Sequence, residues 1–261
     1  MHLQVLANGS AGNSILVRAG ETHVLLDAGL PIRELQERLS LARVSPTRID
    51  HIVLTHGHLD HARSAGTLAK QAGARVHCAP RLMRSRSVRK APRIATLPIG
   101  GTTELTDERG RDPIRLTTVR IPHDAEPTVA LALEAGGRRA LYLTDMGHED
   151  AHVARRLGPA HVVVLESNHD HDLLQRGPYP PKLKERIAGP RGHLSNDESA
   201  GMLRRLAHEE LHTLVLVHLS TTNNTPELAG ATARRTLDDM GRGDVRLLLP
   251  PPSEVGENLE V

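Results

Sequence analysis

Four side chains of types that bind metal ions lie within a run of six residues. The apolar run 51–55 predicts a β-strand, and directly after it come His56, His58, Asp60 and His61. Because side chains alternate along an extended segment, His56 and His58 project to the same side. Imidazole nitrogen and carboxylate oxygen are suitable ligands for Zn²⁺, Mn²⁺ or iron, and this grouping suits two adjacent ions. The alternative is a polar loop rich in histidine, because the chain contains 17 histidines.

Composition limits what else the chain can use for chemistry or binding. Phe and Trp are absent and the two tyrosines are Tyr142 and Tyr179, which argues against nucleic-acid binding through rows of stacked aromatic rings. The single cysteine, Cys78, excludes an intramolecular disulfide and a cysteine-built metal cage. Any metal must therefore be held by histidines and carboxylates. No basic N-terminal region precedes an apolar run, and no apolar stretch approaches about 18 residues. We therefore expect a cytoplasmic protein that does not bind membranes.

Charge is distributed unevenly along a chain whose net charge is only +2. Between Asp60 and Glu104 there is no acidic residue, whereas the basic residues there are Arg63, Lys70, Arg75, Arg81, Arg84, Arg86, Arg89, Lys90 and Arg93. A segment with charge of one sign favours a polyanionic partner. The alternative is a solvated surface in a chain whose basic residues are mostly arginines.

Alternating apolar runs and turn residues predict the elements that must position these side chains. We expect strands at 3–7, 14–18, 23–27, 51–55, 74–78, 94–97, 114–121, 128–134, 138–144, 161–166, 213–217 and 245–249, and helices at 31–41, 62–72, 149–157, 196–208 and 226–239. This order predicts an α/β fold, a four-layer αββα sandwich of two mixed β-sheets with helices on the outer faces. We expect one domain over residues 1–261, in which about 250–261, beginning with three prolines, form a flexible C-terminal tail.

The run from His56 to His61 resembles the H-x-H-x-D-H motif of the metallo-β-lactamase superfamily. The rest of the chain follows the order of that superfamily, since polar residues follow apolar runs at Asp27 before the motif and at His123, Asp145 and His218 after it. The resemblance implies that His56, His58 and His123 hold one divalent ion, Zn²⁺ or Mn²⁺. It implies that Asp60, His61 and His218 hold a second ion and that Asp145 bridges the two ions. It also implies that Asp27 supports the ligand-bearing segment His56–His61 without binding a metal itself.

Six shorter segments resemble the YycJ (WalJ) branch of this superfamily, which is related to RNase Z and RNase J. They are residues 8–14, 122–127, 166–170, 177–187, 192–196 and 218–227. The resemblance implies exonuclease action on DNA, with a role in DNA repair. It also implies that His193 contacts the scissile phosphate. The chain lacks a large insertion between Asp145 and His218 and a long flexible arm, so the basic stretch Arg63–Arg93 is the candidate for holding a long substrate.

Several polar residues are candidates for contacts with substrate. Ser195 or Asn196 can cap the following helix, with Glu198 near capping-box distance. The full set of candidates for substrate contacts is Ser10, Asn13, His169, Ser195 and Asn196. Each has an ordinary structural alternative, a turn or a cap, and the roles of His169, His171 and Tyr179 stay open.

Together these patterns predict a dinuclear metal-dependent phosphodiesterase that acts on nucleic acid, in particular a DNA exonuclease. Asp60, Asp145 and His193 are the expected catalytic residues, and hydroxide on the two ions would attack phosphorus. One alternative is a hydrolase of a small cyclic phosphodiester, thioester or lactone on the same fold, since a fold does not name a substrate. Another is a non-catalytic nucleic-acid-binding module that its metals stabilise.

Overall fold

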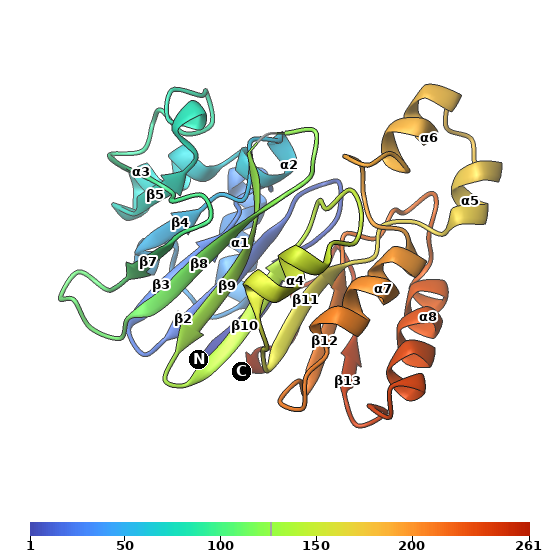
Figure 1. The fold of residues 1–261 in the computed structure, drawn as a ribbon. Coiled ribbons are helices and arrows are strands. Elements are labelled where there is room, and N and C mark those ends of the chain that lie inside the picture. The colour runs from blue at the N-terminus through green and yellow to red at the C-terminus, as the bar shows by residue number, and fades with distance from the viewer. Residues whose placement is uncertain (126) are drawn as a thin grey trace. The chain divides into compact units, whose positions relative to one another are not determined.

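The computed structural model describes residues 1–125 and 127–261, and its strands form two sheets of seven strands each (Figure 1). Contacts divide the chain into two compact units. The first comprises residues 1–118, 133–138 and 250–261, and the second comprises 119–132 and 139–249. The predicted class, an α/β fold with two mixed sheets, is confirmed, and the single domain over 1–261 stays a prediction.

The first sheet carries the strands that precede the histidine-rich segment. Its strand order is β14-β1-β2-β3-β4-β5-β6, and the strands from β3 to β6 run parallel. Because parallel strands end at one edge of a sheet, the residues that follow β3, β4 and β5 lie along that edge. The bounds are β1 His2–Ala7, β2 Ser14–Ala19, β3 Thr22–Leu26, β4 His51–Val53, β5 Arg75–Cys78, β6 Arg93–Thr96 and β14 Leu259–Glu260.

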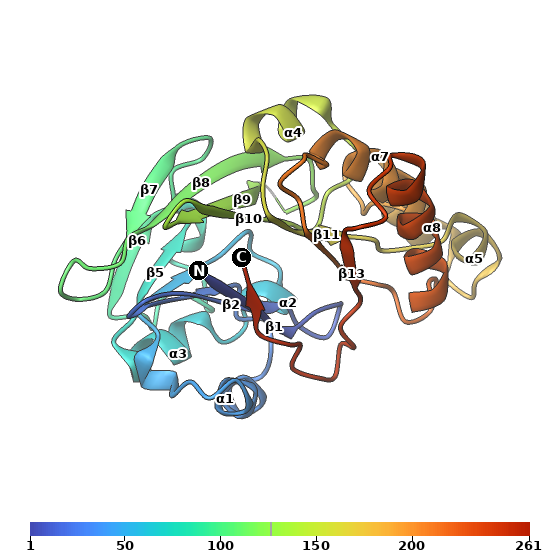
Figure 2. The ribbon, with the colours of Figure 1, turned by 90° about the horizontal axis from the view of Figure 1, so that it is seen from below.

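Helices α1 and α3 cover one face of these strands (Figure 2). Their apolar residues repeat at helical spacing, so Leu35, Leu39 and Leu68 are fully buried in a core with Leu25 and Ile52. Burying each such side chain contributes about 1.5–3 kcal/mol, which holds the helices on the sheet. The helical elements of this unit are α1 Ile32–Leu41, η1 Pro46–Arg48, α2 Leu59–Ala62, α3 Ala65–Ala72 and η2 Pro80–Leu82.

The second sheet has the strand order β13-β12-β11-β10-β9-β8-β7, with β10 to β13 parallel. Helices α7 and α8 lie side by side, with α7 against β11 and α8 against β13 (Figure 1). Its strands are β7 Thr102–Leu105, β8 Ile114–Ile121, β9 Thr128–Ala135, β10 Arg138–Leu143, β11 Val162–Glu166, β12 Thr213–Val217 and β13 Arg246–Leu248. The helices are α4 Ala151–Leu157, α5 His171–Arg176, α6 Pro181–Ile187, α7 Asn196–Leu206 and α8 Pro226–Asp239.

The structure differs from the sequence prediction mainly at short or exposed elements. Strand β7 was not predicted, because its first three residues are exposed or half-buried and give no apolar alternation. The expected flexible tail is instead ordered, since Leu259 pairs with Leu3 in strand β14 and is buried. Gln4 Nε2 donates to Gly256 O at 2.9 Å, and Arg38 Nη1 donates to Pro252 O at 3.0 Å. The prolines end the preceding strand but not the ordered chain. Among the described residues, no helix is both long and apolar enough to cross a membrane.

Two histidines form a side-chain contact between the neighbouring strands β4 and β5. His51 Nδ1 lies 3.0 Å from His77 Nε2, and His51 Nε2 lies 2.8 Å from the carbonyl oxygen of Thr106. Burial lowers the pKa of both imidazoles, so both rings are neutral, and because His51 Nε2–H donates to that carbonyl, its Nδ1 accepts from His77 Nε2–H. Burial lowers the pKa of His77 to about 3, and the neighbouring His51 and Arg75 add to the effect.

This pair makes the first unit sensitive to acid. Because the pKa of His77 is lowered in the folded state, only the unfolded chain takes up the proton as the pH falls below 6.5, and stability declines towards pH 3. We expect His77 to account for about 2 kcal/mol of lost unfolding free energy by pH 5. Urea unfolding of chelator-treated protein checks this. His77→Gln should start less stable but decline less with acid, whereas an equal slope in both proteins would refute the idea. His152→Gln, on the exposed side of α4, is the control.

Candidate metal centre

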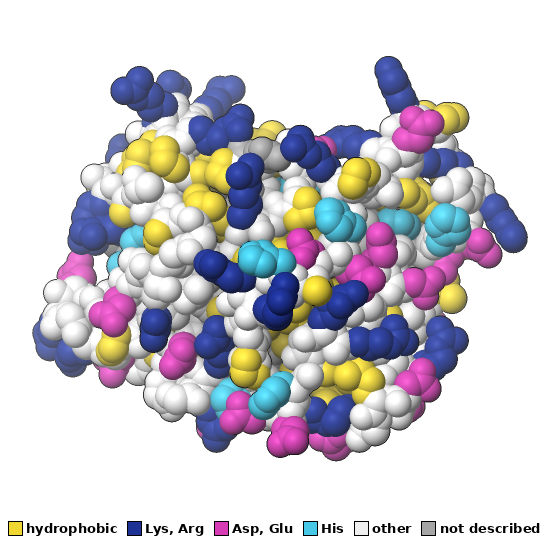
Figure 3. Space-filling model, in the orientation of Figure 1, with side chains coloured by type: hydrophobic (Ala, Val, Ile, Leu, Met, Phe, Trp, Pro, Cys, Tyr) yellow, Lys and Arg dark blue, Asp and Glu magenta, His cyan; other side chains and the backbone are white. Residues whose placement is uncertain are grey.

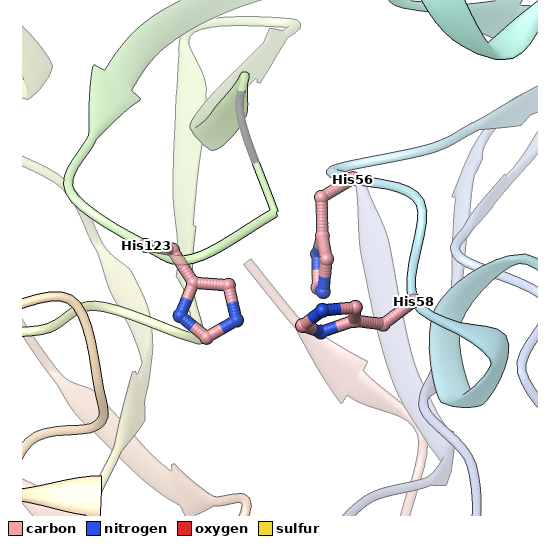
Figure 4. Close-up of side chains that lie close together, drawn as sticks. All are labelled: His56, His58 and His123. Carbon is pink, nitrogen blue, oxygen red and sulfur yellow. The ribbon is translucent and has the colours of Figure 1, made fainter. Parts of the chain in front are cut away.

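The loop after β4 gathers the three histidines of the motif within the first unit. His56 and His61 are completely buried and His58 is half-buried. The ring centroids of His56 and His58 lie 4.8 Å apart with the rings nearly perpendicular, and those of His56 and His61 lie 4.1 Å apart. Figure 4 shows the His56 and His58 rings on the same side of the loop, as their spacing predicts. We call residues 54–61 the metal loop.

A buried carboxylate, Asp27, fixes the metal loop from behind. It follows strand β3 with a φ of 60°, in the left-handed region. Its Oδ1 accepts from the backbone N–H of Thr55 at 2.9 Å, and its Oδ2 accepts from Thr55 Oγ1 at 2.9 Å and from His61 Nδ1 at 2.8 Å. Thr55 Oγ1 also lies 3.1 Å from His56 Nδ1. With both Nδ1 atoms held by oxygen, Nε2 is the nitrogen of each ring that can bind a metal.

The turn that contains Ser10 and Asn13 packs against Asp60. Asn13 is buried, and its backbone N–H donates to Asp60 O at 2.7 Å. Its side-chain Nδ2 lies 2.9 Å from His61 Nε2, whereas Ser10 is exposed. A Cβ on Gly29 would lie 1.6 Å from Asp60 O, so only glycine allows this close approach. Asn13 therefore contacts the metal loop itself, and its expected role towards substrate stays a prediction.

Three other expected ligands follow strands of the second sheet. His123 follows β8, Asp145 follows β10 and His218 follows β12. The Nε2 atoms of His123 and His218 lie 3.7 and 3.9 Å from Asp145 Oδ1. Asp145 and His218 have φ angles of 58° and 60°, and residues that are not glycine adopt this region mainly where the surrounding structure forces it. His123 Nδ1 lies 3.1 Å from Gly192 O, which again leaves Nε2 as the metal-binding nitrogen.

Glu166 is a buried carboxylate that sequence reasoning did not assign. It ends strand β11, and its Oε1 accepts from His193 Nδ1 at 2.7 Å and from His218 Nδ1 at 2.9 Å. Its Oε2 accepts from the backbone N–H of Met146 at 2.9 Å. Burial acts to raise the pKa of Glu166, but the two imidazoles outweigh it and hold that pKa below its usual range. The available signal was its position, because a charged residue ends an otherwise apolar strand, as at Asp27 and Asp145.

His193 lies in the loop before α7, and its side chain is 21% exposed. Possible ligand atoms of His193, Asp145, Glu166 and His218 all lie within 4.8 Å of one another. Because Glu166 Oε1 lies at hydrogen-bond distance from both imidazoles, it orients the two rings. His193 is therefore a polar group beside the expected ligands and need not be a ligand itself.

An amide network fixes the loops that carry His193 and His218. Asn196 and Asn224 exchange side-chain hydrogen bonds at 3.0 and 2.8 Å, and Asn224 Nδ2 donates to Ser167 O at 2.9 Å. Ser167 Oγ also donates to Asn196 Oδ1 at 2.7 Å. Buried polar groups are stable only when they are bonded in this way. The amide of Asn196, an expected substrate residue, thus holds three loops of the second unit together.

The remaining candidates lie close to this network. Ser195 caps α7 and forms the expected capping box with Glu198. His169 is buried and its carbonyl accepts from the backbone N–H of Asn196 at 2.8 Å, while no described group bonds its Nδ1. His171 is exposed at the start of α5, and Tyr179 is half-buried between α5 and α6.

The donor set fits divalent metal ions. In His56, His61, His123 and His218, Nδ1 lies at hydrogen-bond distance from an oxygen atom, of Thr55, Asp27, Gly192 and Glu166 respectively. Proteins orient metal-binding imidazoles in this way, with the second nitrogen as the ligand. The chain therefore carries clusters of histidine and carboxylate able to bind metal.

Two curated bacterial proteins are similar to the chain over nearly its whole length. Exodeoxyribonuclease YycJ of Bacillus anthracis is 28% identical over 245 residues, which cover 93% of this chain and 91% of that protein. Exodeoxyribonuclease WalJ of Streptococcus pneumoniae serotype 2 is 29% identical over 241 residues, 92% of this chain and 90% of that protein.

Solved structures show the same fold. The metallo-β-lactamase fold protein YhfI of Bacillus subtilis superposes with a TM-score of 0.73 at 16% identity and covers 99% of both chains. Zn²⁺-bound PqqB of Methylobacterium extorquens superposes with a TM-score of 0.71 at 18% identity and covers 100% of both chains.

The family described as the beta-lactamase superfamily domain matches residues 22–219. The chain thus belongs to the beta-lactamase superfamily, has the metallo-β-lactamase fold, and is a metal-dependent hydrolase.

Proposed function

We propose that the chain is a nuclease that degrades DNA from an end. Two similar proteins are named exodeoxyribonucleases, and the likeness extends over more than nine-tenths of this chain. The observation that carries the proposal is the pair of Glu166 and His193. A buried carboxylate holds a partly exposed imidazole at 2.7 Å, beside Asp145 and His218. A positioned imidazole of this kind suits proton transfer to the leaving oxygen of a phosphodiester.

Two divalent ions, Zn²⁺ or Mn²⁺, are the proposed cofactors. We assign His56, His58 and His123 to the first ion. We assign Asp60, His61 and His218 to the second, with Asp145 shared. The order of these residues along the chain and the orientation of four of the rings support the assignment. When bound, the ions supply Lewis-acid chemistry, since they polarise phosphate oxygens and lower the pKa of water.

The protein's own groups then orient the reactants and move a proton. Glu166 accepts the Nδ1 proton of His193, so the second nitrogen of that ring is the one that exchanges a proton with the substrate. The proposed acceptor is the 3′ oxygen that leaves phosphorus. Asp145 Oδ2 accepts from Thr144 Oγ1 at 2.8 Å, which fixes the carboxylate that both ions would share. The same Oε1 of Glu166 also orients His218, so one carboxylate couples a ligand to the proton donor.

The proposed activity is tested with end-labelled DNA and RNA, as duplexes and as single strands. We expect protein reconstituted with Mn²⁺ or Zn²⁺ to remove nucleotides progressively from one end of DNA. Thioester, lactone and cyclic phosphodiester substrates are tested in parallel. Turnover of one of these without cleavage of DNA would contradict the proposal in favour of a small-molecule hydrolase. Binding of DNA without any turnover would identify a non-catalytic module.

The Glu166–His193 pair predicts a specific pattern in two variants. His193→Ala should lower kcat on DNA by about 10²–10⁴-fold, because the leaving oxygen loses its proton donor. Bound metal, measured by elemental analysis, should stay at the wild-type amount. Glu166→Gln should also lower kcat. Its amide nitrogen cannot accept a hydrogen bond, so either Met146 N–H or the two imidazoles would lose their acceptor. Glu198→Gln, which alters only the helix cap, is the matched control. Wild-type kcat in His193→Ala would rule out the assigned role.

The contacts of Asp27 predict an effect on metal affinity. In Asp27→Asn, an amide nitrogen replaces one of the two carboxylate oxygens. Since that nitrogen cannot accept a hydrogen bond, the side chain can no longer accept both from the backbone N–H of Thr55 and from His61 Nδ1. We expect the affinity for Zn²⁺ to fall about 10–100-fold, as for other groups that orient ligands. Competition with a chromophoric chelator measures it. Asp50→Asn, whose carboxylate accepts from His23 N–H at the other end of β3, should bind Zn²⁺ like the wild type. Equal affinities in the two variants would show that Asp27 does not support the site.

A further inference from the structure

The segment 80–90, between β5 and β6, displays five cations on its surface. We call it the arginine loop. Its exposed side chains are Arg81, Arg84, Arg86, Arg89 and Lys90. Among the described residues, no carboxylate forms an ion pair with Arg84, Arg86 or Arg89, and the sequence holds no acidic residue between Asp60 and Glu104. Figure 3 shows Lys and Arg side chains gathered at the upper left, where this segment lies in Figure 1. The exposed guanidinium groups of Arg84, Arg86 and Arg89 are therefore available to an external anion.

Apolar packing and backbone hydrogen bonds fix the arginine loop against the first unit. Val88 is completely buried, and Leu82 and Met83 pack against the core of the first unit. Gly66 N–H donates to Ser87 O at 2.7 Å, and a Cβ on Gly66 would lie 2.6 Å from that oxygen. Successive turns within the loop satisfy its own backbone, as in the bond from Ser85 N–H to Leu82 O at 2.8 Å. These anchors hold the backbone that carries the five cations against the first unit.

The same loop touches the metal loop. A Cβ on Gly57 would lie 2.6 Å from Leu82 Cδ2, so the Leu82 side chain packs directly over the glycine between His56 and His58. Both loops follow neighbouring parallel strands, β4 and β5, at the same edge of the sheet. The arginine loop therefore packs, through Leu82, against the segment that carries His56 and His58.

We propose that the arginine loop binds the phosphate backbone of the nucleic acid on which the metal centre acts. The inference rests on the proposed nuclease function and adds the surface that holds the strand beyond the reacting phosphate. Guanidinium groups donate paired hydrogen bonds to phosphate, and three of the five cations have no described carboxylate to displace. The chain has no Phe or Trp to stack on bases, so this contact follows the backbone and not the base sequence.

An anionic membrane is the other polyanion that a basic loop can bind, and the structure favours nucleic acid. Membrane-binding segments combine basic residues with exposed apolar side chains that enter the lipid. In the arginine loop the large apolar residues Leu82, Met83 and Val88 are buried or half-buried against the protein. The packing of Leu82 over Gly57 also joins the arginine loop to the segment that carries the proposed metal ligands, which favours a substrate of that site as the bound polyanion.

The test compares two variants that each remove three positive charges. Arg84→Gln/Arg86→Gln/Arg89→Gln alters the loop. The control, Arg155→Gln/Arg204→Gln/Arg235→Gln, alters exposed arginines on α4, α7 and α8. For the loop variant we expect kcat/KM on a 20-residue DNA strand to fall about 10–100-fold at 0.1 M salt, because about three phosphate contacts are lost. The dependence of log(kcat/KM) on log[salt] should flatten by about 2, at roughly 0.7 for each contact. Turnover of bis(4-nitrophenyl) phosphate, which is too small to reach the loop, should match the wild type and shows that the site is intact.

The outcomes separate this inference from the proposed function. Absence of DNA cleavage by the wild-type protein would overturn the proposed function and this inference with it. DNA cleavage with the same salt dependence in the loop and control variants would overturn this inference alone. Sedimentation with vesicles of phosphatidylcholine and phosphatidylserine tests the membrane. If the loop variant lost vesicle binding while its DNA kinetics stayed at the control value, the surface would belong to a membrane and the proposal would be wrong.

Discussion

The contact on which the candidate centre depends is the hydrogen bond between an imidazole Nδ1 and an oxygen atom behind it. In the first unit Asp27 holds His61, and Thr55 links the same carboxylate to His56. In the second unit Glu166 holds His193 and His218. An imidazole whose Nδ1 is hydrogen-bonded to such an oxygen has only Nε2 available to bind a metal ion, and the hydrogen bond fixes the direction of that atom. Without these oxygens, the rings would lack a defined tautomer and rotamer.

These buried carboxylates impose a condition on the fold. An unpaired carboxylate in an apolar interior costs several kcal/mol, so each must be enclosed by donors. Asp27 receives backbone and side-chain hydrogen bonds from Thr55, and Glu166 receives the backbone N–H of Met146. The donors come from the ends of neighbouring strands, where regular pairing stops and backbone groups become available. The edge of a partly parallel sheet therefore supplies both the functional side chains and the groups that stabilise them.

Backbone conformation at these strand ends points to the same constraint. Asp27, Asp145 and His218 each adopt a left-handed φ near 60°. A residue with a Cβ pays about 1–2 kcal/mol for this conformation. The strain is tolerated because the side chains are buried and tied by hydrogen bonds, and strained residues of this kind gather at functional sites. A glycine also allows close packing at these strand ends, since the absence of a Cβ on Gly29 lets the backbone of Asp60 approach it.

The sequence by itself determined the types of the candidate ligands, their order and most of the strands and helices around them. These properties are local, since residue type and order are given directly by the sequence and apolar periodicity indicates which face of an element is buried. It also predicted a cap of α7 at Ser195 or Asn196 with Glu198 near capping-box distance, and the structure has Ser195 as the cap. The ligand assignment itself stays a prediction.

Only the tertiary structure decided which residues touch. The double role of Glu166, the amide pair of Asn196 and Asn224, and the packing of Leu82 over Gly57 join residues between 25 and 52 positions apart. The ordered C-terminal strand joins residues more than 250 positions apart. No local pattern encodes such contacts, because they arise from the register of strands and the closure of loops. For that reason the run from His56 to His61 could be identified from the sequence, whereas the oxygens that orient its rings could be assigned only in the fold.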